Sequence, residues 1–297
     1  MNYKEIKGYL IAVDLDNTII TGFDNKDLES FQVLKELAKN NYIIIATGRP
    51  WRSSCGFYNW LELNTPIINY NGAYVHHPKD PNFKEIMITI ENKKIKEFVH
   101  KAKDYLINIF CENKDDIYLL NDTDKILPYL HQEGSNLIIG DYDKILNCDT
   151  NGAILFTKPG SEELLEKFIH EVYHDEIRLR HWFTLDTLVS EFYSPETSKA
   201  NALEVIRKYY NIPKSKTIAI GDGHNDIEML DYAHIGVAME DSHNELLPHA
   251  TFITKNVTEH GVKYFFENYD FKEWKNEFYK FKQSWKVHHK CTNWISY

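Results

Sequence analysis

The segment from Tyr9 to Val13 constrains the fold most, because it is an apolar run that leads directly into two carboxylates, Asp14 and Asp16. An unbroken run of this kind is typical of a strand buried on both faces, as in a parallel sheet. Chemistry in open parallel sheets lies at the carboxyl ends of the strands. Because strand side chains alternate, we expect Asp14 and Asp16 to point the same way at that edge. Two like charges so close repel, which predicts a metal ion or a shared proton there.

Two later segments repeat the pattern of a buried strand followed by polar residues. Residues 42–46 form one predicted strand and end at Thr47-Gly48-Arg49, and residues 216–220 form another and end at Gly221-Asp222. Apolar residues recur at helical spacing from Leu28 to Ala38, between the first two strands. A strand–helix–strand unit makes its strands parallel. We therefore expect the polar ends of all three strands to meet at one edge of the sheet.

The sequence pattern changes between residues 83 and 192, where short strand-like and helix-like pieces alternate with Asn- and Asp-rich turns. We expect strands at 107–111, 117–120, 152–156 and 188–192, and helices at 95–106 and 162–173. The rest of the chain continues the α/β pattern, with predicted strands at 66–69 and 235–238 and predicted helices at 198–210 and 227–232. The predicted organisation is an α/β core, residues 1–82 and 193–268, interrupted by an α+β domain at 83–192.

Length and charge narrow the classes of function. The chain has 297 residues, 43% of them hydrophobic, and a formal net charge of −10. An acidic balance argues against binding to nucleic acid, although a small phosphorylated ligand could still bind in a cationic pocket. We find no signal peptide, no apolar run of membrane-spanning length and no Cys-x-x-Cys pair among the four cysteines. We therefore expect a cytoplasmic protein with free thiols and without a membrane partner.

The C-terminal extension, residues 269–297, has an aromatic stripe. Its aromatic residues fall at alternating steps of three and four, with lysines between them: Phe271, Trp274, Phe278, Phe281 and Trp285. This spacing predicts an amphipathic helix. We expect the helix to dock on its own protein, and self-association or a partner contact is the alternative.

The polar residues at the predicted sheet edge form a set suited to phosphoryl transfer. They are Asp14, Asp16, Thr47, Lys199, Asp222, Asn225 and Asp226. Carboxylates would hold Mg²⁺, which prefers oxygen ligands and often shares them with a substrate phosphate. The ammonium and the hydroxyl would bind the other phosphate oxygens. Phosphoryl transfer depends mostly on positioning and charge neutralisation, which this set can supply.

The order of these motifs resembles the haloacid dehalogenase (HAD) superfamily, and in particular its Cof-type branch (subfamily IIB) of sugar phosphatases. The matching segments are Asp14-Leu15-Asp16-Asn17-Thr18, Thr47-Gly48-Arg49, Asn71-Gly72-Ala73, Lys199 and Gly221-Asp222-Gly223-His224-Asn225-Asp226. The resemblance implies a Rossmann-like, doubly wound parallel-sheet core with an inserted C2-type α+β cap. Two features depart from the branch: Ala200 replaces the usual glycine after the lysine, and the aromatic extension is unusual.

The resemblance also implies a role for each motif. Asp14 would attack phosphorus and form an aspartyl-phosphate, and Asp16 would act as general acid and then as general base. Mg²⁺ would be held by Asp14, Asp222 and the backbone carbonyl of Asp16. The remaining residues would bind the phosphate or support the site: Thr47, Gly48, Lys199 and Asn225 in the first role, and Asp226, Arg49, Asn71 and Gly72 in the second.

The predicted function is a Mg²⁺-dependent phosphatase for a small phosphorylated metabolite, with a sugar phosphate as the expected class. One alternative is a phosphotransferase or phosphomutase that passes the same phosphoryl group to an alcohol. Another is a non-catalytic protein that binds a phosphorylated metabolite. Four residues of the inserted domain are candidates for the substrate wall, with plain surface exposure as the alternative: Tyr118, His131, Tyr142 and Arg180.

Two further motifs match other enzyme classes less well. Gly221-x-Gly223 begins like a dinucleotide-binding fingerprint, but Asp226 stands at the third glycine position and would repel a pyrophosphate. His170-Glu171-x-x-His174 fits the zinc-protease pattern. However, the helical spacing places both histidines away from the apolar face of that helix. We therefore expect a solvated helix surface there.

Overall fold

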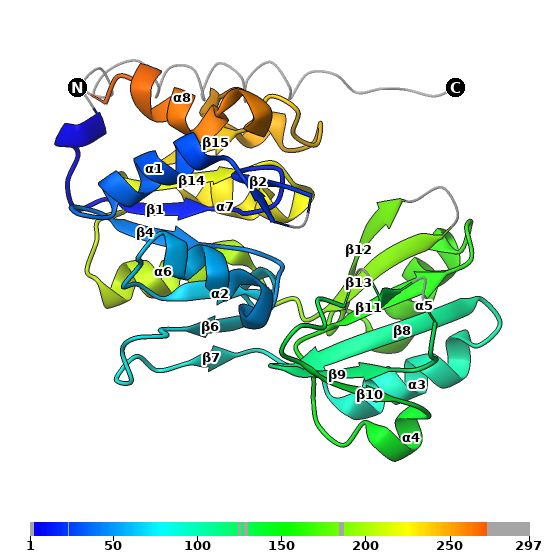
Figure 1. The fold of residues 1–297 in the computed structure, drawn as a ribbon. Helices are drawn as coiled ribbons and strands as arrows, with labels where there is room; N and C mark the ends of the chain where they lie inside the picture. Colours follow the sequence, from blue (N-terminus) through cyan, green and yellow to red (C-terminus); the bar gives the residue numbers. More distant parts are fainter. Residues whose placement is uncertain (1–2, 23, 124–125, 128–129, 184–186, 272–297) are drawn as a thin grey trace, which may run out of the picture.

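The chain forms two main β-sheets flanked by helices, which Figure 1 shows as two lobes. The structure is a computed structural model that describes residues 3–22, 24–123, 126–127, 130–183 and 187–271. The chain passes from the first lobe to the second after strand β7 and returns after strand β13. The predicted fold class, a parallel α/β core with an inserted α+β cap, is confirmed.

The main sheet of the first lobe is parallel throughout, with the strand order β16-β15-β14-β1-β4. Its strands are β1 Leu10–Val13, β4 Tyr42–Ile45, β14 Thr217–Gly221, β15 Ile235–Ala238 and β16 Phe252–Ile253. All four residues of β1 are buried. Val13 lies beside Ile45 of one neighbour and Ile220 of the other. The carboxyl ends of β14, β1 and β4 therefore lie level with one another, as the sequence predicted.

Helices cover both faces of this sheet, which is the doubly wound arrangement (Figure 1). On one face the strands pack against α1 (Leu28–Leu37) and α8 (Gly261–Asn268), and on the other against α6 (Lys199–Tyr209) and α7 (Ile227–Tyr232). Alternate residues of each strand contact opposite layers, because successive strand side chains point to opposite faces. Each fully buried aliphatic side chain contributes about 1.5–3 kcal/mol to this packing.

A small antiparallel sheet extends the first lobe beyond β4. It consists of β5 (Ile67–Asn69), β6 (Tyr74–His76) and β7 (Ile86–Met87). A bridge between Ala46 and Ile68 joins it to the end of β4. β7 lies inside the range 83–192 that we predicted for the inserted domain, yet it pairs with β6.

The second lobe contains a six-stranded sheet with the order β10-β9-β8-β11-β13-β12. Its strands are β8 Leu106–Asn113, β9 Asp116–Leu119, β10 Asn136–Ile139, β11 Ala153–Thr157, β12 Arg178–Phe183 and β13 Leu188–Tyr193, and its helices are α3 Asn92–Ala102, α4 Tyr142–Ile145 and α5 Glu162–Tyr173. All neighbouring pairs are antiparallel except β9 and β10. The mixture of a mostly antiparallel sheet with helices is the predicted α+β organisation.

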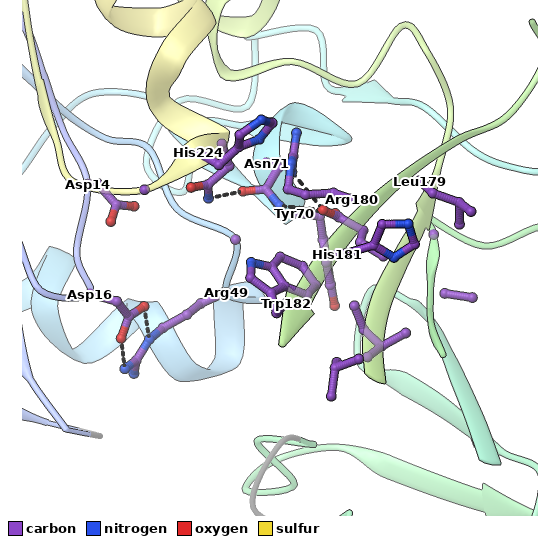
Figure 2. A pocket seen from close by; sticks show the side chains of 18 of the residues that line it. Asp14, Asp16, Arg49, Tyr70, Asn71, Leu179, Arg180, His181, Trp182 and His224 are labelled. Atoms are coloured by element: carbon purple, nitrogen blue, oxygen red, sulfur yellow. Dashed lines mark hydrogen bonds and ion pairs between the residues drawn. The ribbon is translucent and has the colours of Figure 1, made fainter. Parts of the chain in front are cut away.

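The two faces of this second sheet have different surroundings. One face packs on α3 and α5, with Phe98, Leu165 and Phe192 in its core. The other face carries Phe110, Val189 and, on the same strand as Val189, Glu191. Because side chains alternate along a strand, Val189 and Glu191 share this second face. This face turns toward the first lobe and therefore toward the candidate site (Figures 1 and 2).

Several element boundaries differ from those predicted. The helix expected at 95–106 ends at Ala102, and Leu106 already belongs to β8. The apolar pair Leu106-Ile107 fits a helical or an extended period, so periodicity alone could not place this boundary. Other elements were not predicted at all: the hairpin β2 Ile20–Thr21 with β3 Asn25–Lys26, helix α2 Trp51–Trp60, and β6, β7, β10, α4, β12 and α8.

The predicted aromatic helix at 269–297 lies almost entirely outside the described residues. Phe271 is described, and its ring contacts Tyr9, Phe265 and Tyr269 on the surface of the first lobe. The stripe from Trp274 to Trp285 is not described, so its docking or self-association stays a prediction. Among the residues that are described, no helix combines the length and apolar character needed to cross a bilayer.

His76 on β6 generates a prediction about stability and pH. Its ring is buried, stacks on Tyr74 and shares a hydrogen bond of 3.3 Å with the Oδ1 of Asn69. Burial lowers the pKa of His76 to about 4. The folded state therefore binds fewer protons than the unfolded state below the ordinary pKa of histidine. We expect the free energy of unfolding to fall on the order of 2 kcal/mol as the pH drops from 6.5 toward 4.

Urea unfolding at a series of pH values checks this, and His76→Gln should remove part of the slope between pH 6.5 and 5. Glutamine keeps a donor for Asn69 but does not titrate. His100→Gln, at an exposed position of α3, is the control and should leave the slope unchanged. An identical slope in His76→Gln and the parent protein would show that His76 does not cause the loss.

Candidate active site

The carboxyl ends of β1, β4 and β14 bring together residues that are far apart in the sequence. Asp14 directly follows β1, and its backbone N–H donates to the carbonyl of Ile220 at 3.0 Å. Ala46 donates to the carbonyl of Val13 at 3.0 Å on the other side. These backbone bonds hold Asp14 between the β4 end and the β14 end, as the sequence predicted.

Three carboxylates meet at this edge. Asp14, Asp222 and Asp226 each offer an oxygen that lies within 4.8 Å of the others. Burial raises the pKa of Asp14 well above its usual value, although the Lys199 ammonium opposes this. Burial, reinforced by the nearby Asp226, raises the pKa of Asp222 to about 7. The site therefore carries more buried negative charge than its residues can neutralise, and an all-oxygen donor set of this kind fits Mg²⁺.

Lys199 supplies the cation of the site. It begins α6, and the preceding Ser198 caps the helix by accepting from the backbone N–H of Ala200 at 3.1 Å. The Lys199 ammonium donates at 2.7 Å to Asp14 and at 2.7 Å to Asp226, and the residue is 1% exposed. Burial favours the neutral amine, but the two carboxylates outweigh it and raise the pKa of Lys199 above its ordinary value. The lysine is thus a fixed positive charge.

Asp226 has both carboxylate oxygens engaged within the protein. One oxygen accepts from Lys199, and the other accepts from the backbone N–H groups of Asp222 and Gly223 at 3.2 and 3.0 Å. A Cβ atom on Gly221 would lie 2.4 Å from the Asp226 side chain, so this close approach requires glycine. Asp226 therefore orients Lys199 and shapes the turn after β14.

Asp16 lies outside the cluster of Asp14, Asp222 and Asp226, although Asp14 and Asp16 line the same cavity. β1 ends at Val13, so strand alternation no longer applies at residues 14–16. Both oxygens of Asp16 accept from Arg49, at 2.9 Å from Nε and 2.5 Å from an Nη atom (Figure 2). Thr18, from the same loop, donates to Asp222 at 3.1 Å. Besides burial, the charges of Asp226, Asp222 and Asp16, in that order, raise the pKa of Asp14.

The predicted phosphate-binding residues lie around one corner of the site. The Thr47 hydroxyl accepts from the Arg49 backbone N–H at 3.1 Å, and the Thr47 carbonyl accepts from the Asn71 N–H at 3.0 Å. A Cβ atom on Gly48 would lie 3.2 Å from the Asn71 side chain. Asn225 donates to the Oδ1 of Asn71 at 2.8 Å. These contacts join the β4 end to the turn after β14.

Gly72 allows the start of α6 to approach this corner. Its φ is +106°, and a Cβ atom there would lie 2.3 Å from the Ser198 carbonyl oxygen. Any other residue would collide with the backbone and would also be strained in this conformation. The Asn71-Gly72 turn therefore fixes how close Lys199 comes to the sheet edge.

A cavity of about 1060 Å³ opens from these residues toward the second lobe. Of the four candidate wall residues, His131 and Arg180 line it (Figure 2 shows Arg180). Tyr118 and Tyr142 do not line the cavity, and both are buried. For these two residues, the expected place in the substrate wall and the alternative of surface exposure were therefore both wrong. The Tyr142 hydroxyl is buried in the second lobe and donates to the Tyr118 carbonyl at 2.7 Å.

Sequence reasoning missed two further wall residues, Glu191 and Trp182. Both line the cavity, from the neighbouring strands β13 and β12. A signal for Glu191 was available: it is a charged residue within the otherwise apolar or small run Leu188–Phe192, and a buried charge needs a partner. Its partner is Arg180, which donates to it at 2.7 Å.

Arg52 was also missed, and it ties the two lobes together. The side chain of this α2 residue is buried, and its guanidinium donates to the carbonyls of Leu130 and His131 at 3.0 and 2.8 Å. It also donates to the Lys114 carbonyl at 3.0 Å and forms an ion pair with Glu112. Burial raises the pKa of Glu112 to about 7, although Arg52 opposes this. One core residue thus holds two separate segments of the inserted domain.

The zinc-protease motif has the solvated position that we expected. His170 lies on α5 and His174 follows that helix, and both are exposed. Neither lines the cavity. Among the described residues, the group that could hold a metal ion is Asp14 with Asp222 and Asp226.

Replacing Lys199 should show how strongly the site depends on its charge. Lys199→Met keeps most of the side-chain volume but leaves Asp14 and Asp226 buried without their shared cation. We expect unfolding in metal-free buffer to become about 3–5 kcal/mol easier. Urea denaturation measures this. Lys208→Met, which removes an exposed ion pair with Glu204 on the same helix, should cost less than about 1 kcal/mol. Equal losses in the two variants would contradict the prediction.

Comparison with known proteins identifies a family to which the chain is similar. The haloacid dehalogenase-like hydrolase family matches residues 11–266. The 5-amino-6-(5-phospho-D-ribitylamino)uracil phosphatase YitU of Bacillus subtilis is 32% identical over 269 residues, which cover 89% of this chain and 98% of YitU.

Solved structures share the fold. TM0651 from Thermotoga maritima superposes with a TM-score of 0.73 at 21% identity, over 89% of this chain and 98% of its own. The HAD subclass IIB sugar phosphatase BT4131 superposes with a TM-score of 0.70 at 18% identity, over 86% of this chain and 96% of its own. Because the family match spans residues 11–266 and the YitU alignment spans nearly the whole of that protein, the chain belongs to the haloacid dehalogenase-like hydrolases and is a phosphoric monoester hydrolase of that family.

Proposed function

We propose that this protein is a Mg²⁺-dependent phosphatase that hydrolyses a small phosphorylated metabolite through an aspartyl-phosphate on Asp14. The observation that carries the proposal is the position of Asp14, which is paired with a buried lysine at 2.7 Å, belongs to a carboxylate cluster and lines a large cavity. Mg²⁺ bound by Asp14 and Asp222 would supply positive charge to the phosphate and to the carboxylates. It would also offset the burial that raises the pKa of both groups.

In the first step, an Asp14 oxygen attacks phosphorus, and the bond from phosphorus to the leaving oxygen breaks. The Lys199 ammonium stays at the Asp14 carboxylate, where it can also bind phosphate oxygens. Thr47 and Asn225 would donate to the remaining oxygens, since both lie at the same corner of the site. The chain thereby neutralises the phosphoryl charge by fixed groups, which is the main requirement of this chemistry.

Asp16 would move the proton in each half of the reaction. It protonates the leaving alcohol in the first half and takes a proton from the attacking water in the second, which frees Asp14 and phosphate. Both Asp16 oxygens are bonded to Arg49 in the structure. The acid step therefore requires Asp16 to release at least one of these bonds, and the 44% exposure of its side chain leaves room for that movement.

For the substrate, we propose a phosphate ester of a sugar or sugar alcohol. YitU is named for a substrate with a phosphorylated ribityl chain, and BT4131 is named a sugar phosphatase. The cavity of about 1060 Å³ has room for more than the phosphate group. Arg180 lines its wall and carries a guanidinium, which can only donate hydrogen bonds. This donor suits a hydroxyl or carbonyl oxygen of the leaving group.

Asp14→Asn tests the proposed nucleophile. An amide is a far weaker nucleophile, so phosphate release from 4-nitrophenyl phosphate should fall by at least about 10³-fold. The melting temperature should not fall, since the variant removes a buried charge. Asp231→Asn, an exposed change in α7, should keep full activity.

EDTA should abolish the activity of the parent protein and Mg²⁺ should restore it. Turnover retained by Asp14→Asn would overturn the mechanism, and phosphate transferred to added sugars instead of water would indicate a phosphotransferase.

Asp16→Asn separates the proposed proton transfer from binding. An alkyl phosphate has a poor leaving group that needs a proton, whereas 4-nitrophenolate leaves without one. We expect kcat to fall about 10²- to 10⁴-fold for an alkyl phosphate and clearly less for the first half-reaction with 4-nitrophenyl phosphate. Single-turnover kinetics with both substrates measures this. Equal losses for both leaving groups would show that Asp16 does not act as the acid.

A further inference from the structure

The predicted phosphate-binding residues Thr47, Gly48 and Asn225 define what we call the phosphate corner of the core. A row of hydrogen bonds runs from this corner into the cap. The Nδ2 of Asn225 donates to the Oδ1 of Asn71 at 2.8 Å. The Nδ2 of Asn71 donates to both oxygens of Glu191, at 3.0 and 3.2 Å. Arg180 in turn donates to Glu191 at 2.7 Å (Figure 2 labels Asn71 and Arg180). Asn71 and Glu191 are 5% and 8% exposed, so water does not compete for these bonds.

The direction of these bonds is set at the Glu191 end. An ionised carboxylate accepts hydrogen bonds but cannot donate them. The carboxamide of Asn71 must therefore turn its amino group toward Glu191, which leaves its carbonyl oxygen facing Asn225. That oxygen in turn can only accept, so Asn225 must face it with its own amino group. One carboxylate on the cap thus determines the orientation of two carboxamides on the core.

The orientation of Asn225 matters because a phosphate group offers only acceptors at neutral pH. With its amino group toward Asn71, Asn225 keeps a second N–H at the phosphate corner. Its carbonyl oxygen lies instead against Gly223, where a Cβ atom would be only 2.4 Å away. The inverted carboxamide would present an oxygen to the phosphate and would repel it.

We propose that Glu191 is a positioning residue of the cap, which holds the amino group of Asn225 toward the phosphate by way of Asn71. This inference rests on the proposed function. Arg180 stabilises Glu191 by its ion pair and lies over the Tyr193 ring at 4.7 Å. Glu191 belongs to β13 of the cap. The amino group of Asn225 is therefore held toward the phosphate only while the cap contacts the core. The inserted domain therefore contributes to phosphate binding without contacting the phosphate.

Glu191→Gln is the decisive variant, since glutamine has the same shape but can donate as well as accept. Asn71 and Asn225 are then free to invert. We expect the dissociation constant of inorganic phosphate for the Mg²⁺-loaded protein to rise about tenfold or more, which corresponds to one hydrogen bond. KM for 4-nitrophenyl phosphate should rise in parallel, with a smaller change in kcat. Calorimetric titration and steady-state kinetics measure the two effects.

Two further variants make the test specific. Glu166→Gln removes a carboxylate of the same cap, at the cavity rim, whose side chain is 67% exposed, and it should bind phosphate like the parent protein. Asn71→Leu breaks the row at its centre while leaving the pair of Glu191 with Arg180 intact, and it should weaken phosphate binding as Glu191→Gln does. This second route remains open if Glu191→Gln does not fold.

The results distinguish this inference from the proposed function. Phosphate affinity unchanged in both Glu191→Gln and Asn71→Leu overturns the positioning role, and so does a loss of melting temperature without a loss of affinity. An absence of turnover in the parent protein would instead overturn the proposed function, and the phosphate titration would still report on Glu191.

Discussion

The buried ammonium of Lys199 is the interaction on which the site depends. It lies 2.7 Å from the carboxylate of Asp14, which follows β1, and 2.7 Å from the carboxylate of Asp226, which follows β14. Without it, the carboxylates that follow neighbouring parallel strands would repel one another at the one place where the fold brings them together. The cation therefore has two effects that cannot be separated. It permits the sheet edge to be acidic, and it places positive charge where phosphate oxygens would bind.

Close backbone approaches make this charge arrangement fit. Gly72 lets the Asn71 turn meet the start of α6, and Gly221 lets Asp226 fold back toward the strand end. In both places a Cβ atom would lie within 2.5 Å of its neighbour. The ammonium reaches its two partners only because α6 begins so near the sheet. The ion pairs of Lys199 therefore depend on how closely α6 packs against the sheet, since a shift of the helix would separate the charges.

The sequence predicted what short-range patterns determine. The runs 9–13, 42–46 and 217–220 are mostly aliphatic or β-branched, so both the strands and the polar residues that end them could be placed. Lys199 was placed by the helix start at Ser198. The pairing of Asp16 with Arg49 could not be predicted, because strand alternation stops at Val13 and the loop geometry after it is irregular.

Contacts between the lobes could not be predicted from the sequence either, because they too depend on geometry that no local pattern determines. Arg52 and Glu112 are 60 residues apart, and Asn71 and Glu191 are 120 apart. Each pair meets only because the inserted domain sits at a particular angle on the core, and no local period encodes that angle. The edge strand β12 was missed because its alternation of polar and apolar residues covers only Arg178–Arg180 and stops at His181. The charge of Glu191 within β13 was the one visible sign that this face of the domain has a polar partner.

Arg52 sets a condition on any movement of the two lobes relative to each other. Its guanidinium is shared among a carboxylate, a phenol and three backbone carbonyls, from both lobes. Because the guanidinium is rigid and planar, a movement away from one of these partners also moves it away from the others. Any separation of the lobes at Arg52 therefore has to break several hydrogen bonds and the ion pair with Glu112 together.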